Sequence, residues 1–161
     1  MEKELWAEER VRVFLSRAED TAVRSEIHEQ IKAFNDATSP AHRQARKPGS
    51  IQPLHVLVRD EEGRLRGGLI ADTYWDWLDL EDFWLEAALR GNGLGARVLR
   101  AAEEEAIERG CKNAKLETFS FQARGFYEKF GYRVVGRLDG YPPGQSFYWM
   151  SKELGEPPAA G

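Results

Sequence analysis

Apolar positions recur along the first fifty residues in patterns that predict a strand, a helix and a loop. Residues 11–16 alternate with period two, which is typical of a half-buried strand. We expect a helix that begins after the capping residue Asp20 and ends near Asn35, because apolar side chains recur there three or four residues apart: Val23, Ile27, Ile31 and Phe34. Two prolines and a glycine within 37–50 indicate a loop with room for a short helix.

The middle of the chain predicts three consecutive strands and then a long helix. Apolar runs at 54–59 and 64–75 flank the turn D-E-E-G and predict an antiparallel hairpin. Residues 75–86 continue as a third strand. Its alternation predicts one face with Trp77, Asp79, Glu81 and Phe83, and another with Leu78, Leu80, Asp82 and Trp84. At 94–109, apolar residues four apart predict an amphipathic helix, which Gly110 ends.

The last third of the chain predicts one further helix and three strands. The helix is expected at 123–130, and the strands at 113–119, 132–138 and 147–150. No internal repeat or linker divides the chain. We therefore expect a single domain over residues 1–154, followed by a disordered tail at 155–161.

Composition excludes several classes of function. The chain has 161 residues, of which 42% are hydrophobic, and this suits one buried core. Its formal net charge of −4 offers no general attraction to nucleic acid or to an anionic membrane. A single cysteine, Cys111, and a charged N-terminus without an apolar signal segment favour a cytoplasmic protein. His28, His42 and His55 lack the spacing of metal ligands, so no metal is expected.

A glycine-rich turn, R-G-N-G-L-G at 90–95, lies between a predicted strand and the amphipathic helix. Unpaired N–H groups and the positive end of the helix dipole make such a turn an anion site, so we expect a phosphate-bearing ligand; the alternative is a plain helix cap. The turn also fits the dinucleotide fingerprint G-x-G-x-x-G/A, with Glu117 downstream. A preceding meander and an acid-rich strand disfavour that interpretation, because a dinucleotide fold has a buried parallel strand there.

Two sequence motifs resemble those of one enzyme family. R-G-N-G-L-G resembles the R/Q-x-x-G-x-G/A signature of the GNAT superfamily of acetyl-CoA-dependent N-acetyltransferases, and A-R-G-F-Y-E-K-F-G-Y at 123–132 is similar to its A-x-x-F-Y-x-x-x-G-F/Y segment. The resemblance covers residues 10–154. It implies an α/β (α+β) fold with a mixed, mostly antiparallel sheet of six to seven strands, flanked by helices and splayed between the fourth and fifth strands, where acetyl-CoA binds.

The resemblance also implies which residues hold acetyl-CoA. The backbone N–H groups of Asn92, Gly93, Leu94, Gly95 and Ala96 would hold the pyrophosphate, and Arg90 and Gly91 of the same turn would also contact the cofactor. A backbone N–H near Leu85 would face the thioester carbonyl and stabilise the oxyanion. Ser120 stands where many relatives have an asparagine that contacts the pantetheine arm, and a hydroxyl offers fewer hydrogen-bonding groups than an amide.

Acetyl transfer to an amine needs a proton for the leaving thiolate and an acceptor for the proton of the amine. The resemblance favours Tyr127 as the general acid, although its spacing with Ala123 and Phe126 is also that of a core stripe. An alkylammonium is neutral only about once in 2,500 molecules at neutral pH, so a base is expected in the acid-rich strand. Glu81 is the first candidate; Asp79, Asp82 and a purely solvated strand face stay open.

The sequence therefore predicts an N-acetyltransferase that moves the acetyl group of acetyl-CoA directly to a primary amine of a small molecule. The alternatives are an NAD-dependent oxidoreductase and a non-catalytic acyl-CoA-binding module. Residues 72–86 carry six acids and no Lys or Arg, which we expect to attract a cationic amine. Tyr74, Trp75 and Trp77 either wall an acceptor pocket or belong to the core. The oligomeric state is left open by the sequence, and a homodimer is one alternative because exposed strand edges often pair.

Overall fold

The computed structural model describes residues 2–155 and contains two compact units, Met1–Gln44 and Ala45–Gly161, which are described separately below. The prediction of a single domain over 1–154 stays a prediction. Apart from Gly155, the predicted disordered tail lies outside the described residues. No helix within the described range is long and apolar enough to cross a membrane.

The described residues up to Ala45 form four elements: β1 (Glu2–Glu8), β2 (Val11–Ser16), α1 (Thr21–Thr38) and α2 (Pro40–Ala45), whose last residue begins the second unit. β1 and β2 pair in an antiparallel hairpin. β2 and the short helix α2 confirm the sequence patterns, whereas β1 was not predicted. Every residue of β1 is exposed, and a strand exposed on both faces tolerates the charged residues that obscure its pattern.

Helix α1 has the predicted cap and the predicted apolar face. Asp20 Oδ1 accepts hydrogen bonds from the N–H groups of Ala22 and Val23 at 3.0 and 3.1 Å. The helix continues to Thr38, beyond the predicted end at Asn35, and stops before Pro40, which disfavours helical backbone in the residue that precedes it. Its apolar side chains are between 49% and 68% exposed: Val23, Ile27, Ile31 and Phe34.

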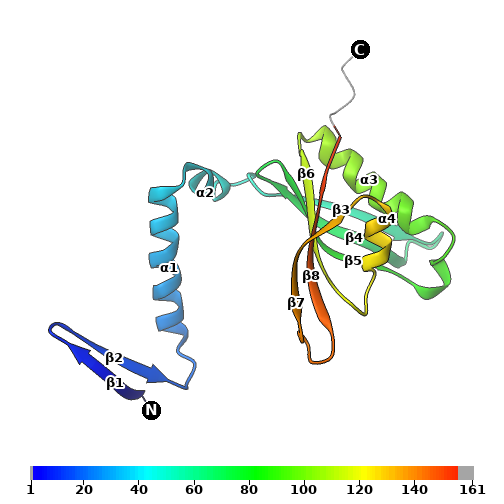
Figure 1. Ribbon diagram of the computed structural model, residues 1–161. Helices are drawn as coiled ribbons and strands as arrows, with labels where there is room; N and C mark the ends of the chain where they lie inside the picture. The colour runs from blue at the N-terminus through cyan, green and yellow to red at the C-terminus, as the bar shows by residue number, and fades with distance from the viewer. Residues whose placement is uncertain (1, 156–161) are drawn as a thin grey trace. The chain divides into compact units, whose positions relative to one another are not determined.

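The second unit is built on a six-stranded sheet with the order β3-β4-β5-β6-β8-β7 (Figure 1). The strands are β3 (Gln52–Arg59), β4 (Leu65–Tyr74), β5 (Trp77–Leu85), β6 (Asn113–Phe119), β7 (Arg133–Asp139) and β8 (Ser146–Glu153). β5 and β6 are parallel, and the other neighbours are antiparallel. This confirms the predicted mixed, mostly antiparallel sheet flanked by helices.

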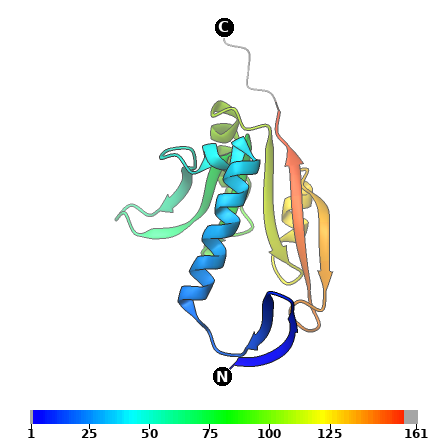
Figure 2. The same ribbon diagram turned by 90° about the vertical axis from the view of Figure 1, so that its left-hand side faces the viewer.

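Helices α3 (Leu94–Glu108) and α4 (Arg124–Lys129) lie on the same side of this sheet (Figure 1), and the short 3-10 helix η1 (Ala87–Leu89) precedes the glycine turn. The core lies between these helices and the sheet, and its largest fully buried side chains are Leu69, Leu78, Leu99, Tyr132 and Met150. The opposite side, here called the second face, includes the side chains that alternate with core residues, such as Asp79, Glu117 and Trp149. On that side, β6 and β8 run next to each other, with β7 at the sheet edge (Figure 2).

Strands β5 and β6 pair only near their beginnings. The parallel register joins Trp77–Leu80 to Asn113–Leu116 and ends there. Beyond these residues β5 continues beside β4 and β6 continues beside β8, so the two strands diverge. The fourth and fifth strands predicted from the sequence, at 75–86 and 113–119, correspond to β5 and β6. Their divergence confirms the predicted splay.

A β-bulge at Glu81 overturns part of the predicted alternation in β5. Leu80 pairs with Ala71 and Asp82 pairs with Ile70, so Glu81 is an extra residue in the strand. An extra residue inverts every side chain that follows it. Phe83, predicted to share a face with Asp79, therefore packs against the core, and Trp84 lies exposed on the second face.

Candidate active site

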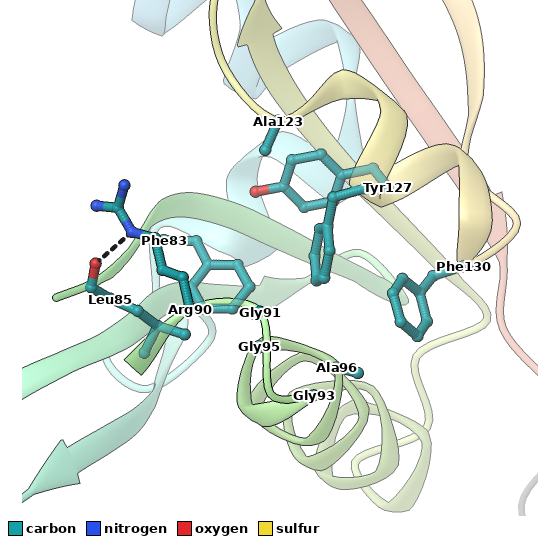
Figure 3. A pocket seen from close by; sticks show the side chains of 11 residues that line it. Phe83, Leu85, Arg90, Gly91, Gly93, Gly95, Ala96, Ala123, Tyr127 and Phe130 are labelled. Carbon is teal, nitrogen blue, oxygen red and sulfur yellow. Dashed lines mark hydrogen bonds between the residues drawn. The ribbon is translucent and has the colours of Figure 1, made fainter. Parts of the chain in front are cut away.

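A cavity of about 410 Å³ lies between the start of α3, the end of β5 and helix α4 (Figure 3). Its lining residues are Phe83, Leu85, Arg90, Gly91, Gly93, Gly95, Ala96, Ala123, Phe126, Tyr127 and Phe130. The structure thus brings together most of the predicted glycine turn, the predicted strand end and the predicted general acid. Predicted site residues outside this lining are Glu81, Asn92, Leu94 and Ser120.

The glycine turn has the geometry of an anion site. Gly91 and Gly93 have φ angles of +80° and +83°, a left-handed backbone that glycine adopts without strain. Asn92 Oδ1 accepts a hydrogen bond from the Leu94 N–H at 3.1 Å, so one N–H of the first helical turn already has a partner. N–H groups in the first turn of a helix have no partner within the helix, and both Gly95 and Ala96 line the cavity.

Arg90 joins the turn to the end of β5. Its Nε donates a hydrogen bond of 2.8 Å to the carbonyl oxygen of Leu85 (Figure 3). The next residue, Glu86, donates its N–H to the carbonyl of Arg66 on β4 at 3.0 Å. Because successive residues of a strand direct their polar groups to opposite edges, the backbone of Leu85 faces away from β4, toward the side on which β5 and β6 diverge.

Tyr127 belongs to the core through its ring and to the cavity through its hydroxyl. Its ring centroid lies 5.3 Å from that of Phe126 and 5.8 Å from that of Tyr132, both in edge-on contacts. The hydroxyl points from α4 into the space in front of Phe83 and Arg90 (Figure 3). Burial raises the pKa of Tyr127 from 10.0 to about 12, so the phenol is protonated at neutral pH.

The candidate bases lie in different environments. Glu81 is exposed at the bulge, in the first position of β5 beyond its pairing with β6. Asp79 already has two partners: it accepts a hydrogen bond of 2.7 Å from the Tyr74 hydroxyl, and Lys115 Nζ lies 2.5 Å away. The pKa of Tyr74 is raised, first by burial and second by the hydrogen bond to Asp79.

Half of the acids at 72–86 are paired with bases. Lys112 lies 3.1 Å from Asp76 and Arg66 lies 2.6 Å from Glu86, in addition to the Lys115–Asp79 pair. Among residues 2–155, no ion pair involves the other three, Asp72, Glu81 and Asp82. The charge that remains for a ligand is therefore concentrated at these three side chains.

Ser120 is engaged by the loop that precedes β8. Its hydroxyl donates a hydrogen bond to Gln145 Oε1 at 2.6 Å and accepts one from the Ser146 N–H at 3.1 Å. These bonds connect the end of β6 to the start of β8. Contact between Ser120 and the pantetheine arm stays a prediction.

Three aromatic rings of the cavity were not predicted as site residues: Phe83, Phe126 and Phe130. Phe126 and Phe130 share the helical stripe of Tyr127, and that spacing was the available signal. The strict alternation of β5 concealed Phe83, because only the bulge turns its ring toward Phe126, 5.9 Å away.

Comparisons with known proteins agree with this geometry. Residues 15–132 match the acetyltransferase (GNAT) family. A blasticidin-S acetyltransferase from Streptomyces morookaense is 39% identical over 131 residues, which cover 78% of this chain and 96% of that protein. The crystal structure of an acetyltransferase from Bacillus cereus superposes with a TM-score of 0.74 at 28% identity, and the match covers 87% of this chain and 97% of that one.

A structure from Bacillus anthracis, solved in complex with acetyl coenzyme A, shares the fold with a TM-score of 0.56 at 20% identity, covering 71% of this chain and 68% of that one. The matched family, the diverging strands and the glycine turn at the start of α3 lead to one assignment. The chain belongs to the acetyltransferase (GNAT) family.

Proposed function

We propose that this acetyltransferase moves the acetyl group of acetyl-CoA directly to the primary amine of a cationic small molecule. The observation that supports the proposal is the cavity in which the glycine turn, the end of β5 and the Tyr127 hydroxyl meet. Acetyltransferases of this family use acetyl-CoA as the acetyl donor. Here the turn and the positive end of α3 would hold its pyrophosphate.

Three groups of the chain would serve the chemical step. The amine nitrogen attacks the thioester carbon, and the Leu85 N–H would stabilise the oxygen that gains negative charge. The carbon–sulfur bond then breaks, the departing thiolate takes the phenolic proton of Tyr127, and the acylated nitrogen gives up its second proton, which restores the phenol. With a pKa of about 12, Tyr127 holds that proton until the thiolate forms.

Glu81 is the base that we propose for the incoming ammonium, acting directly or through a water molecule. It lies where β5 and β6 diverge, and among residues 2–155 it forms no ion pair that would occupy its carboxylate. Asp79 is a weaker candidate because Tyr74 and Lys115 already contact it.

The name of the Streptomyces relative supports a small-molecule acceptor, since that protein is a blasticidin-S acetyltransferase. The acids without ion-pair partners support a positively charged acceptor.

A cytoplasmic location and a homodimer are further parts of the proposal. The exposed apolar side chains of α1 support the homodimer, because they form a surface that a second copy of the chain could cover. Light scattering of the purified chain measures its mass, and a monomeric mass contradicts the homodimer.

The deciding experiment measures thiol release from acetyl-CoA in the presence of blasticidin S, aminoglycosides, diamines, monoamines and peptides. We expect acceptor-dependent release with at least one cationic amine, and saturable binding of acetyl-CoA. Binding of acetyl-CoA without release for any amine supports the non-catalytic module instead. Binding of NAD without binding of acetyl-CoA contradicts the proposal.

A further inference from the structure

A second cavity, of about 540 Å³, lies on the second face of the sheet. The residues that line it include Trp77, Lys115, Glu117, Gly136 and Trp149. Two indole rings and a carboxylate are thus brought together from β5, β6 and β8. None of these residues contributes to the first cavity.

Trp149 is held in place from three sides. Its Nε1 donates a hydrogen bond of 3.0 Å to Glu117 Oε1, across the pairing of β6 with β8. The Phe147 ring contacts it edge-on, with centroids 5.0 Å apart. A Cβ on Gly136 would lie 2.8 Å from Trp149 Cε3, so the indole rests directly against the glycine backbone. A ring fixed in this way offers a flat surface for stacking.

The charge of Glu117 is not compensated within the described residues. Its partner Trp149 is neutral, and Glu117 takes part in none of the ion pairs of residues 2–155. The nearby cation, Lys115, is paired with Asp79 at 2.5 Å. Burial alone would lower the pKa of Lys115, but its contacts with Asp79 raise the pKa above its usual value, so Lys115 stays charged. The cavity therefore presents one carboxylate to a ligand.

Glu117 occupies a defined place in the sheet. The parallel pairing of β5 with β6 ends at Leu80 and Leu116, so Glu81 and Glu117 are the first residues of the two diverging segments. Phe83 and Leu85, from the diverging part of β5, line the first cavity. Glu117 is thus the residue of the second cavity that lies at the start of the divergence, one residue beyond the pairing, as the proposed base Glu81 is on β5.

We propose that this second cavity is an acceptor subsite, in which Glu117 binds a second cationic group of the acceptor and Trp149 stacks on a flat ring that carries it. The inference rests on the proposed function. It narrows the class of acceptor to molecules with a flat ring and two ammonium or amidinium groups. Glu117 determines specificity here, whereas the reacting amine lies at the divergence near Glu81. Stacking and a charge-assisted hydrogen bond favour such a cation together.

The test uses two probes that share one aromatic ring: p-xylylenediamine, with two ammonium groups, and 4-methylbenzylamine, with one. Binding to the full chain is followed through the indole N–H signal of Trp149 in ¹⁵N-correlated NMR spectra, assigned from its loss in Trp149→Phe. We expect a saturable shift with the diamine, and an apparent Kd at least about tenfold higher in Glu117→Gln, which loses one charge-assisted hydrogen bond. Glu62→Gln, on the β3–β4 turn outside the cavity, should bind within about twofold of the unmodified protein. The monoamine should bind more weakly than the diamine, because its single ammonium cannot occupy Glu117 and the divergence near Glu81 together.

Acetyl transfer to both probes is measured in parallel, so that the two proposals fail separately. A Trp149 signal that does not respond to the diamine, or equal affinity with and without the Glu117 charge, overturns the subsite. That result leaves the proposed function standing if thiol release occurs. A Glu117-dependent shift with no thiol release from any amine supports the subsite and contradicts the acetyl transfer.

Discussion

The ammonium of Lys152 lies 2.7 Å from Glu103 Oε2, and this ion pair joins β8 to α3 across the core side of the sheet. Glu103 is only 7% exposed, and Lys152 also lies 5.6 Å from the centre of the Tyr132 ring. A buried carboxylate without its partner is costly, so the pair contributes to the position of α3, whose first turn belongs to the proposed anion site.

Replacing Lys152 by methionine should therefore lower the free energy of unfolding by about 2–4 kcal/mol, because it leaves the Glu103 carboxylate buried and unpaired. Urea denaturation measures the loss. Lys112→Met is the matched control, since its pair with Asp76 is 76% and 61% exposed and should contribute less than about 1 kcal/mol. Equal losses in the two variants would contradict a role for burial.

Replacing Tyr127 by phenylalanine should lower kcat about a hundredfold and change the Kd of acetyl-CoA by less than about twofold, because the variant keeps the ring and removes the proton donor. Steady-state kinetics and calorimetry measure the two quantities. Tyr132→Phe removes a buried hydroxyl from the neighbouring ring outside the cavity and should retain kcat. Unchanged turnover in Tyr127→Phe removes Tyr127 from the mechanism.

The raised pKa of Tyr127 also predicts a loss of stability in alkali. Folding favours the neutral phenol, so its contribution is complete below pH 10 and declines as the pH rises from 10 toward 12. By pH 11 the decline amounts to about 1.4 kcal/mol. The difference in unfolding free energy between the unmodified protein and Tyr127→Phe should shrink by this amount between pH 9 and pH 11. A difference that stays constant with pH is the contrary result.

Replacing Gly93 by alanine should weaken acetyl-CoA binding about tenfold, because a Cβ disfavours its left-handed backbone by about 1–2 kcal/mol and the turn must change shape to relieve this strain. Gly144 has a similar φ, +78° against +83°, and a Cβ meets no atom within 4 Å at either position. Gly144→Ala should therefore lose similar stability and keep its affinity. Thermal unfolding and calorimetry separate the two effects, and equal affinity in both variants argues against binding at the turn.

Replacing Glu81 by glutamine should lower kcat/KM at least about tenfold at neutral pH, with recovery at high pH, where more of the amine is already neutral. Asp79→Asn should act mainly on stability, because Asp79 contacts Tyr74 and Lys115. A pH–rate profile of each variant distinguishes the roles. Activity of Glu81→Gln equal to that of the unmodified protein at every pH rejects Glu81 as the base.

The parts of the fold that local rules determine were predictable from the sequence. Helix α3 has both a strong apolar period and a glycine turn before it, and both signals lie within twenty residues. The splay between β5 and β6 came from the family resemblance, because strand pairing joins residues that are far apart in the sequence.

The face assignment beyond Glu81 failed for a physical reason. A bulge is defined by the partner strand, and no property of Glu81 itself marks it as the extra residue. The same limit applies to the cavity on the second face, where Glu117, Gly136 and Trp149 meet only because β6, β7 and β8 are neighbours in the sheet. Ser120 shows the same limit. Its residue type predicted that it would form hydrogen bonds, but not that its partners would be Gln145 and Ser146.

The bulge at Glu81 makes the faces of β5 depend on its pairing with β4 more than on its composition. Deleting Glu81 would restore strict alternation and leave Phe83 and Leu85 facing the first cavity, whereas regular pairing of Glu81 with β4 would turn both away from it and Trp84 toward the core. Most substitutions in the same strand leave every side chain on its present face. One added residue thus allows a single strand to line the first cavity with Phe83 and Leu85 while Trp77, from its other half, lines the cavity on the second face.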